Sequence, residues 1–213
     1  KKKHEDLTGA ILRPLAKPLI MLLLHTSITP NQISMISIIP ALLSLFFLIN
    51  AGYQNTLIGS ILAFVYLILD ATDGQLAREK KIQSIFGHWL DGIIGYIFVP
   101  FMILATAIGS KNYATLVIGS IAALCFPIQF TLIYYYNSDI KKNDQRIDLP
   151  IPTRWNFLSY IYGQALFIPL LLISAILNQT TIILWFFAIF GHLFWMIILY
   201  IQYLNLKKEK TNP

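Results

Sequence analysis

The sequence predicts an all-α integral membrane protein with six transmembrane helices preceded by an amphipathic interfacial helix. The chain of 213 residues is 56% apolar and only 12% charged, with a mean hydropathy of +0.64, so it has too little polar surface to coat a soluble globule. It also contains apolar stretches of about 20 residues, the helical length that crosses a hydrocarbon core about 30 Å thick. These stretches lack an alternation of period two, which favours helices over a β-barrel.

The amino-terminal segment, residues 1–26, differs from the apolar stretches that follow it. Arg13, Lys17 and His25 interrupt its apolar pattern, which is typical of a helix that lies in the membrane interface. We expect one membrane domain over residues 1–213, with no separate soluble module. Its parts are an interfacial helix over 1–26, a six-helix bundle over 31–205 and a cytoplasmic tail over 206–213.

The six predicted spans follow one another with short links. Thr29, Pro30 and Gln32 predict a capping box at the start of the first span, with proline at the first helical position. The spans cover residues 31–50, 56–79, 83–109, 113–137, 155–177 and 181–205.

The distribution of lysine and arginine predicts the orientation of the bundle. Of the 16 basic residues, all but Lys111 fall in the amino-terminal segment, the links after the second and fourth spans, or the tail. The positive-inside rule therefore places both termini on the cytoplasmic side. We also expect the membrane to be a bacterial or archaeal cytoplasmic membrane. The net charge of +6 is then explained by topology and by attraction to anionic lipid, and we do not expect nucleic-acid binding.

Three aspartates lie where the second and third spans approach the cytoplasmic side. Asp70 and Asp73 share one helical face with Gly74 and Ala77, and Asp91 lies in the next span. At a rise of 1.5 Å per residue, Asp73 is about 9 Å inside the end of its span and Asp91 about 12 Å inside the start of the next. The three carboxylates can therefore meet at one level, where intramembrane charges indicate a functional site.

Carboxylates that lie so close together repel one another unless a cation lies among them. A hard divalent cation such as Mg²⁺ or Mn²⁺ prefers oxygen ligands and commonly brings a phosphate group with it. Two other readings stay open: an acidic face that lines a water-filled pore, and pairing of the carboxylates with Arg78. The small residues Gly74, Ala77 and Gly87 either admit a ligand or allow close helix packing.

The spacing of these residues resembles the signature of the CDP-alcohol phosphotransferase (CDP-alcohol phosphatidyltransferase) family. That signature is DxxDGxxAR, eight residues, and then GxxxDxxxD. Members have six membrane helices after an interfacial helix, and often a Thr-Pro-Asn sequence like that at residues 29–31. The matching residues are Asp70, Asp73, Gly74, Ala77, Arg78, Gly87 and Asp91.

The resemblance implies that an acceptor hydroxyl attacks the phosphorus distal to cytidine in a CDP-alcohol and that CMP leaves. It implies Mg²⁺ or Mn²⁺ on Asp70, Asp73 and Asp91. It also implies that the nucleotide binds near Asp70 and near four other residues of the signature, which are Gly74, Ala77, Arg78 and Gly87. A homodimer and a fused or separate cytidylyltransferase are further implications.

One position departs from the family signature. Gly95 stands where the family has a fourth aspartate, which is usually assigned to proton abstraction or a second metal ion. Either another group takes the proton, or the acceptor needs little help, or the protein is catalytically impaired. The catalytic candidates are Asp91 and His88, since histidine titrates near neutral pH; an interfacial histidine without a catalytic role is the alternative for His88. Restoring the carboxylate with Gly95→Asp is expected to change turnover substantially.

Three functions are compatible with the sequence. The first is a CDP-alcohol phosphotransferase that uses CDP-diacylglycerol or a soluble CDP-alcohol and a lipid or polar acceptor. The second, favoured by Gly95, is a catalytically impaired family member that binds the nucleotide-lipid without turnover. The third is a cation transporter, which would need deeper carboxylates and usually an inverted repeat.

Overall fold

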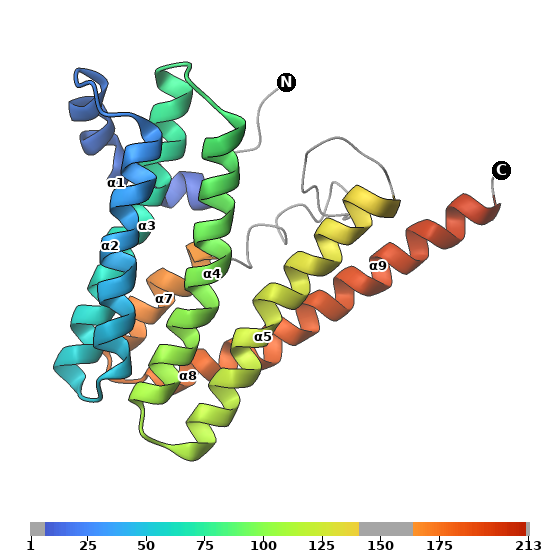
Figure 1. Cartoon of the computed structure of the whole chain (residues 1–213). Helices are drawn as coiled ribbons and strands as arrows, with labels where there is room; N and C mark the ends of the chain where they lie inside the picture. Colours follow the sequence, from blue (N-terminus) through green and yellow to red (C-terminus); the bar gives the residue numbers. More distant parts are fainter. Residues whose placement is uncertain (1–6, 141–163, 212–213) are drawn as a thin grey trace.

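The computed structural model describes residues 7–140 and 164–211, and this part of the chain consists of helices joined by short links (Figure 1). The described segments contain α-helices and two short π-helical turns, η1 and η3, and no strand. The all-α prediction is confirmed. The elements are α1 (Leu7–Leu24), α2 (Pro30–Ile49), α3 (Tyr53–Glu79), α4 (Ile85–Gly109), α5 (Tyr113–Tyr135), η1 (Tyr136–Ile140), α7 (Gln164–Ile176), α8 (Thr180–Phe186), η3 (Phe187–Gly191) and α9 (His192–Thr211).

Five helical segments among the described residues are long and apolar enough to cross a membrane. They are Pro30–Ile49, Tyr53–Glu79, Ile85–Gly109, Tyr113–Ser138 and Thr180–Lys207. The predicted fifth span corresponds to α7, which is apolar but only 13 residues long in the described part of the chain. The remainder of that predicted span, residues 155–163, lies outside the described residues.

The predicted last span over 181–205 corresponds to the continuous helical segment Thr180–Lys207. A π-helical turn, η3, lies inside this segment between α8 and α9. The predicted tail over 206–213 is helical as far as Thr211. Lysine and glutamate, which dominate residues 207–210, are good helix formers, and they extend α9 beyond its apolar part.

The predicted amino-terminal helix is present as α1, over Leu7–Leu24. Four of its side chains are buried at helical spacing. Ala16, Ile20 and Leu23 pack in one cluster with Ile33 of α2 and Leu76 of α3, whereas Leu12 belongs to the main core. Other apolar side chains of α1, such as Met21 and Leu22, are exposed. The helix thus has one face against α3 and another face free of the protein.

The start of α2 is fixed by the predicted capping box. The Thr29 hydroxyl accepts a hydrogen bond from the Gln32 amide, and the Gln32 side chain accepts one from the Thr29 amide at 2.9 Å. Ser84 caps α4 in a similar way by accepting a hydrogen bond from the Gly87 amide at 3.0 Å. Both helix starts lie at the same end of the bundle, together with the α3–α4 link (Figure 1).

Close contacts between helices occur where small residues lie. A Cβ atom on Gly109 of α4 would overlap the backbone carbonyl of Leu48 on α2, and one on Gly119 of α5 would overlap Ala107. In lipid, helix association depends on such close van der Waals packing, because burial of apolar surface gives no advantage over contact with lipid tails.

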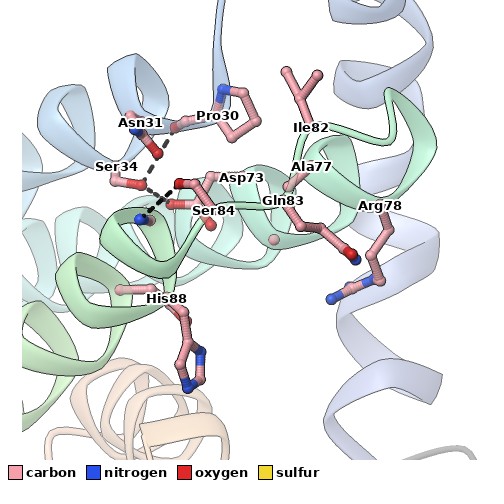
Figure 2. A pocket seen from close by; sticks show the side chains of 13 residues that line it. Pro30, Asn31, Ser34, Asp73, Ala77, Arg78, Ile82, Gln83, Ser84 and His88 are labelled. Carbon is pink, nitrogen blue, oxygen red and sulfur yellow. Dashed lines mark hydrogen bonds between the residues drawn. The ribbon is translucent and has the colours of Figure 1, made fainter.

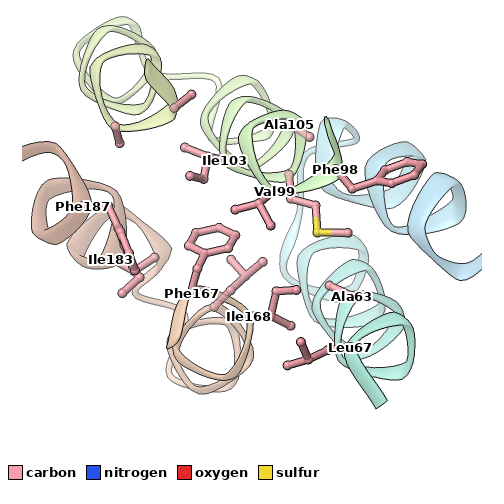
Figure 3. Close-up of a cluster of buried hydrophobic side chains, with 14 of the residues drawn as sticks. Ala63, Leu67, Phe98, Val99, Ile103, Ala105, Phe167, Ile168, Ile183 and Phe187 are labelled. Carbon is pink, nitrogen blue, oxygen red and sulfur yellow. The ribbon is translucent and has the colours of Figure 1, made fainter. Parts of the chain in front are cut away.

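The core lies in the middle of the bundle, where α3, α4, α7 and α8 meet (Figure 3). Phe167 of α7 packs edge-on against Phe187, with ring centroids 5.3 Å apart. From this core α2, α3 and α4 run side by side toward the end that holds the α3–α4 link (Figure 1). The predicted site residues lie at that end.

Candidate functional site

A polar pocket of about 300 Å³ opens between α2, α3 and α4, beside the link from α3 to α4 (Figure 2). Its lining combines two carboxylates, an arginine, a histidine, hydroxyl and amide groups, and small residues. The lining residues are Pro30, Asn31, Ser34, Asp73, Gly74, Ala77, Arg78, Ile82, Gln83, Ser84, Gly87, His88 and Asp91.

Asp73 is held at the wall of this pocket by a residue of α2. Its Oδ2 atom accepts a hydrogen bond of 2.5 Å from the Ser34 hydroxyl (Figure 2). Both side chains are only 4% exposed. A buried carboxylate needs hydrogen-bond partners, and Ser34 supplies one at a fixed position.

Asp70 lies one helical turn before Asp73 on α3 and is not part of the pocket lining. Its carboxyl group is within hydrogen-bonding reach of Asp91 on α4 and interacts electrostatically with Asp73. Its Oδ2 atom also accepts a 2.7 Å hydrogen bond from Nε2 of Gln164, the first residue of α7. The three carboxylates therefore lie near one another between α3 and α4.

The donor set at this level consists of oxygen atoms, which suits a hard divalent cation. In the side-chain arrangement of the described segments, however, no three His, Cys, Asp or Glu residues form a group ready to hold a metal ion. Ser34 and Gln164 already bond to Asp73 and Asp70. Both bonds use the Oδ2 atom of the carboxylate, so Ser34 and Gln164 do not occupy the Oδ1 atoms of Asp73 and Asp70, and they hold these carboxylates in place for a cation.

Two basic side chains accompany the carboxylates. Arg78 lines the pocket one turn beyond Gly74 and interacts electrostatically with Asp73 and Asp91. His88 is exposed on the α4 wall and interacts electrostatically with Asp91. In Figure 2 its ring points away from Ser34 and Asp73.

The two motif glycines have different surroundings. A Cβ atom on Gly74 would meet only Nη1 of Arg78, at 3.7 Å, so the pocket is open there. A Cβ atom on Gly87 would lie 2.8 Å from Oδ1 of Asn31 and 3.1 Å from the Ser84 hydroxyl. Gly87 therefore lets α2 approach the first turn of α4, whereas Gly74 leaves space beside Asp73.

Seven of the predicted site residues line this one pocket, and Asp70 lies just behind it. Sequence reasoning did not assign Ser34, Ser84 or Gln164 to the site. Ser34 had a signal, because it is a polar residue inside an apolar span, next to the capping box. Gln164 had none, since it lies 94 positions from the residue that it contacts.

Comparison with known proteins gives a family and a fold. The family model described as CDP-alcohol phosphatidyltransferase matches residues 27–198, which is more than half of the chain. No match to a curated protein sequence was found. The fold is similar to the crystal structure of Mycobacterium tuberculosis phosphatidylinositol phosphate synthase with CDP-DAG bound, at a TM-score of 0.57 and 16% sequence identity. The similarity covers 91% of this chain and 94% of the other.

Proposed function

Because this chain belongs to the CDP-alcohol phosphatidyltransferase family, and is thus a transferase, we propose that its polar pocket transfers a substituted phosphate from a CDP-alcohol to an acceptor hydroxyl, with release of CMP. The observation that carries the proposal is the meeting of Asp70, Asp73 and Asp91 beside an open pocket. Their side chains come from two antiparallel helices.

Charge decides how the donor would be held. A pyrophosphate is anionic, and two carboxylates of the pocket wall, Asp73 and Asp91, would repel it without a cation between them. Asp70, Asp73 and Asp91 would hold Mg²⁺ or Mn²⁺. The bound cation would neutralise the negative charge on the phosphate oxygens. Arg78 adds a fixed positive charge with several N–H donors, suited to a phosphate group.

The small residues determine where the nucleotide can lie. Gly74 and Ala77 leave the α3 side of the pocket open, so a planar base can approach the backbone there. The amino-terminal end of α4, which begins after Ser84, lies on the opposite wall. Because helix amino termini favour anions, we propose that the phosphate end of the donor lies toward α4.

In the proposed reaction, the acceptor oxygen forms a bond to the phosphorus distal to cytidine while the bond from that phosphorus to the CMP oxygen breaks. The electron pair of the broken bond leaves with CMP. The acceptor hydroxyl loses its proton, and Asp91 and His88 are the groups of the α4 wall that can accept it. Catalysis then rests on positioning and on electrostatic stabilisation of the phosphate.

The surroundings of the pocket support a lipid-linked donor. The solved structure of similar fold holds CDP-DAG, and the pocket here lies at the ends of helices that are apolar enough to cross a membrane. We propose CDP-diacylglycerol as the first donor to test and soluble CDP-alcohols as the second. The acceptor is a lipid or a small polar alcohol.

The membrane arrangement is part of the same proposal. The five long apolar helices and α7 would form six spans in one domain, with α1 in the interface. The basic residues would then put both termini and the pocket on the cytoplasmic side.

A screen for CMP tests the proposal. The purified chain in lipid nanodiscs is incubated with Mg²⁺, one of several CDP-alcohols and one of several alcohols, and CMP is measured by chromatography. Release of CMP that requires both donor and acceptor is expected for at least one pair. Binding of a CDP-alcohol without CMP release from any pair would favour the impaired family member instead.

A further inference from the structure

Gln164 makes a bridge between two side chains of α3 beside the carboxylate cluster. Its Nε2 atom donates a 2.7 Å hydrogen bond to Asp70, and its Oε1 atom accepts a 3.1 Å hydrogen bond from the Tyr66 hydroxyl. Tyr66 and Asp70 are one helical turn apart and so share a face of α3. The amide belongs to the first residue of α7 and ties that helix to the site.

The amide has only one useful orientation in this bridge. The Tyr66 side chain is fully buried and donates its proton to the amide oxygen. The amide nitrogen must then face Asp70, because a carboxylate accepts hydrogen bonds and does not donate them. The Asp70 carboxylate thus sets which way the amide faces, and the Tyr66 hydroxyl, by donating to Oε1, holds the Gln164 side chain in place against Asp70.

Gly95 of α4 provides the space that the amide occupies. A Cβ atom at this position would lie 2.9 Å from Oε1 and 3.5 Å from Cδ of Gln164. The distance to Oε1 is shorter than a real Cβ contact allows, so a side chain at position 95 would displace the amide of Gln164 from its present position. Three helices, α3, α4 and α7, therefore meet at this amide.

We propose that Gln164 is a positioning residue of the site, which holds the Asp70 carboxylate against Asp91 while Tyr66 fixes the amide and Gly95 leaves room for it. The inference rests on the proposed function, because Asp70 has a catalytic purpose only there. A neutral amide restrains Asp70 without adding a further negative charge to three clustered carboxylates. A carboxylate at position 164 could not donate to Asp70 and would repel it.

The proposal predicts a specific defect when the amide is removed. Gln164→Met keeps the length of the side chain and removes both hydrogen bonds. Asp70 then loses its partner, and the concentration of Mg²⁺ needed for half-maximal CMP release is expected to rise about tenfold, the usual effect of losing a hydrogen bond to a charged group. Tyr66→Phe removes only the hydroxyl that holds the amide. This change is expected to raise the Mg²⁺ concentration for half-maximal CMP release about threefold.

A double-mutant cycle separates positioning from general support of the fold. Tyr66 acts through Gln164, so Tyr66→Phe should add nothing to Gln164→Met, whereas independent structural effects would multiply. Gln202→Met is the matched control, because Gln202 also donates from its side chain to another helix, to the Leu132 carbonyl at 3.1 Å. Gln202 does not contact the site, and its replacement should leave the Mg²⁺ requirement unchanged.

The experiment has two readouts on full-length protein in nanodiscs. The first is CMP release at increasing MgCl₂, and the second is the midpoint of thermal unfolding at increasing MgCl₂ without substrate. In both readouts, the MgCl₂ concentration at half-saturation is expected to rise for Gln164→Met and Tyr66→Phe. It is expected to stay unchanged for Gln202→Met. The proposal is overturned if half-saturation in Gln164→Met stays within twofold of the original chain, or if the two substitutions multiply. If the unaltered chain responds to MgCl₂ in neither readout, the proposed function fails, and this inference fails with it.

Discussion

The Ser34 hydroxyl on α2 donates a 2.5 Å hydrogen bond to the Asp73 carboxylate on α3, and both groups are almost completely buried. This contact connects the helix that begins with the capping box to the helix that carries the first half of the aspartate motif. It sets the position of the carboxylate at the pocket wall before any ligand binds.

Removing this hydroxyl should weaken the reaction more than the fold. In Ser34→Ala, Asp73 loses a charge-assisted hydrogen bond of about 1.5–3 kcal/mol, so kcat/KM for CMP release should fall about tenfold or more. Ser44→Ala is the control, because the buried Ser44 hydroxyl on the same helix has no hydrogen-bond partner among the described residues. Equal activity of the two variants would show that Ser34 does not position Asp73.

A methyl group at Gly87 should close the gap between α2 and α4. Gly87→Ala places a Cβ atom 2.8 Å from Oδ1 of Asn31 and 3.1 Å from the Ser84 hydroxyl, so the pocket wall must shift and kcat/KM should fall by at least about tenfold, since overpacking costs about 1–3 kcal/mol. Gly92→Ala on the same helix meets its nearest neighbour at 3.5 Å and should be nearly neutral. CMP release that is equal in both variants would contradict this role of Gly87.

The structure predicts the direction in which Gly95→Asp changes turnover. A new side chain at this position must displace Gln164, and Asp70 then loses its amide partner. Gly95→Asp alone should therefore lower turnover, and Gly95→Asp combined with Gln164→Ala should recover part of it, because the second change makes room. Turnover of the single variant at or above that of the double variant would contradict the proposed competition for space.

Lys111 offers a stability test away from the site. It adopts a left-handed backbone with a φ of 50° in the α4–α5 link, which costs a residue other than glycine about 1 kcal/mol. Lys111→Gly should therefore raise the midpoint of thermal unfolding, and Lys111→Ala should not, because alanine keeps the unfavourable conformation. Activity should be unchanged in both, since the link lies at the end of the bundle opposite the pocket (Figure 1).

Much of the bundle could be predicted because membrane helices have a strong local signal. The first span was expected over 31–50 and is found at Pro30–Ile49, with the capping box of Thr29 and Gln32 in place. The meeting of Asp70, Asp73 and Asp91 also followed from spacing, since two antiparallel helices with a short link bring residues at similar depth together.

The partners of these carboxylates could not be predicted in the same way. Ser34 and Gln164 reach the site from α2 and α7, and their contacts depend on how apolar helices rotate against one another. That rotation is set by close packing at residues such as Gly109 and Leu48, and apolarity on all sides of a helix gives no indication of the face that packs. The π-helical turn at Phe187–Gly191 likewise had no signal in the sequence.

The central claim is that the aspartate cluster performs metal-dependent CMP release. It is tested most directly by measuring CMP formation with and without Mg²⁺ for the unaltered chain, Asp70→Asn and Asp91→Asn, with the best donor and acceptor pair. We expect activity that EDTA abolishes and Mg²⁺ or Mn²⁺ restores, and a loss of at least about 100-fold in each variant, as for groups that stabilise charge in a transition state. Full activity of both variants, or release of CMP that is indifferent to EDTA, would contradict the account.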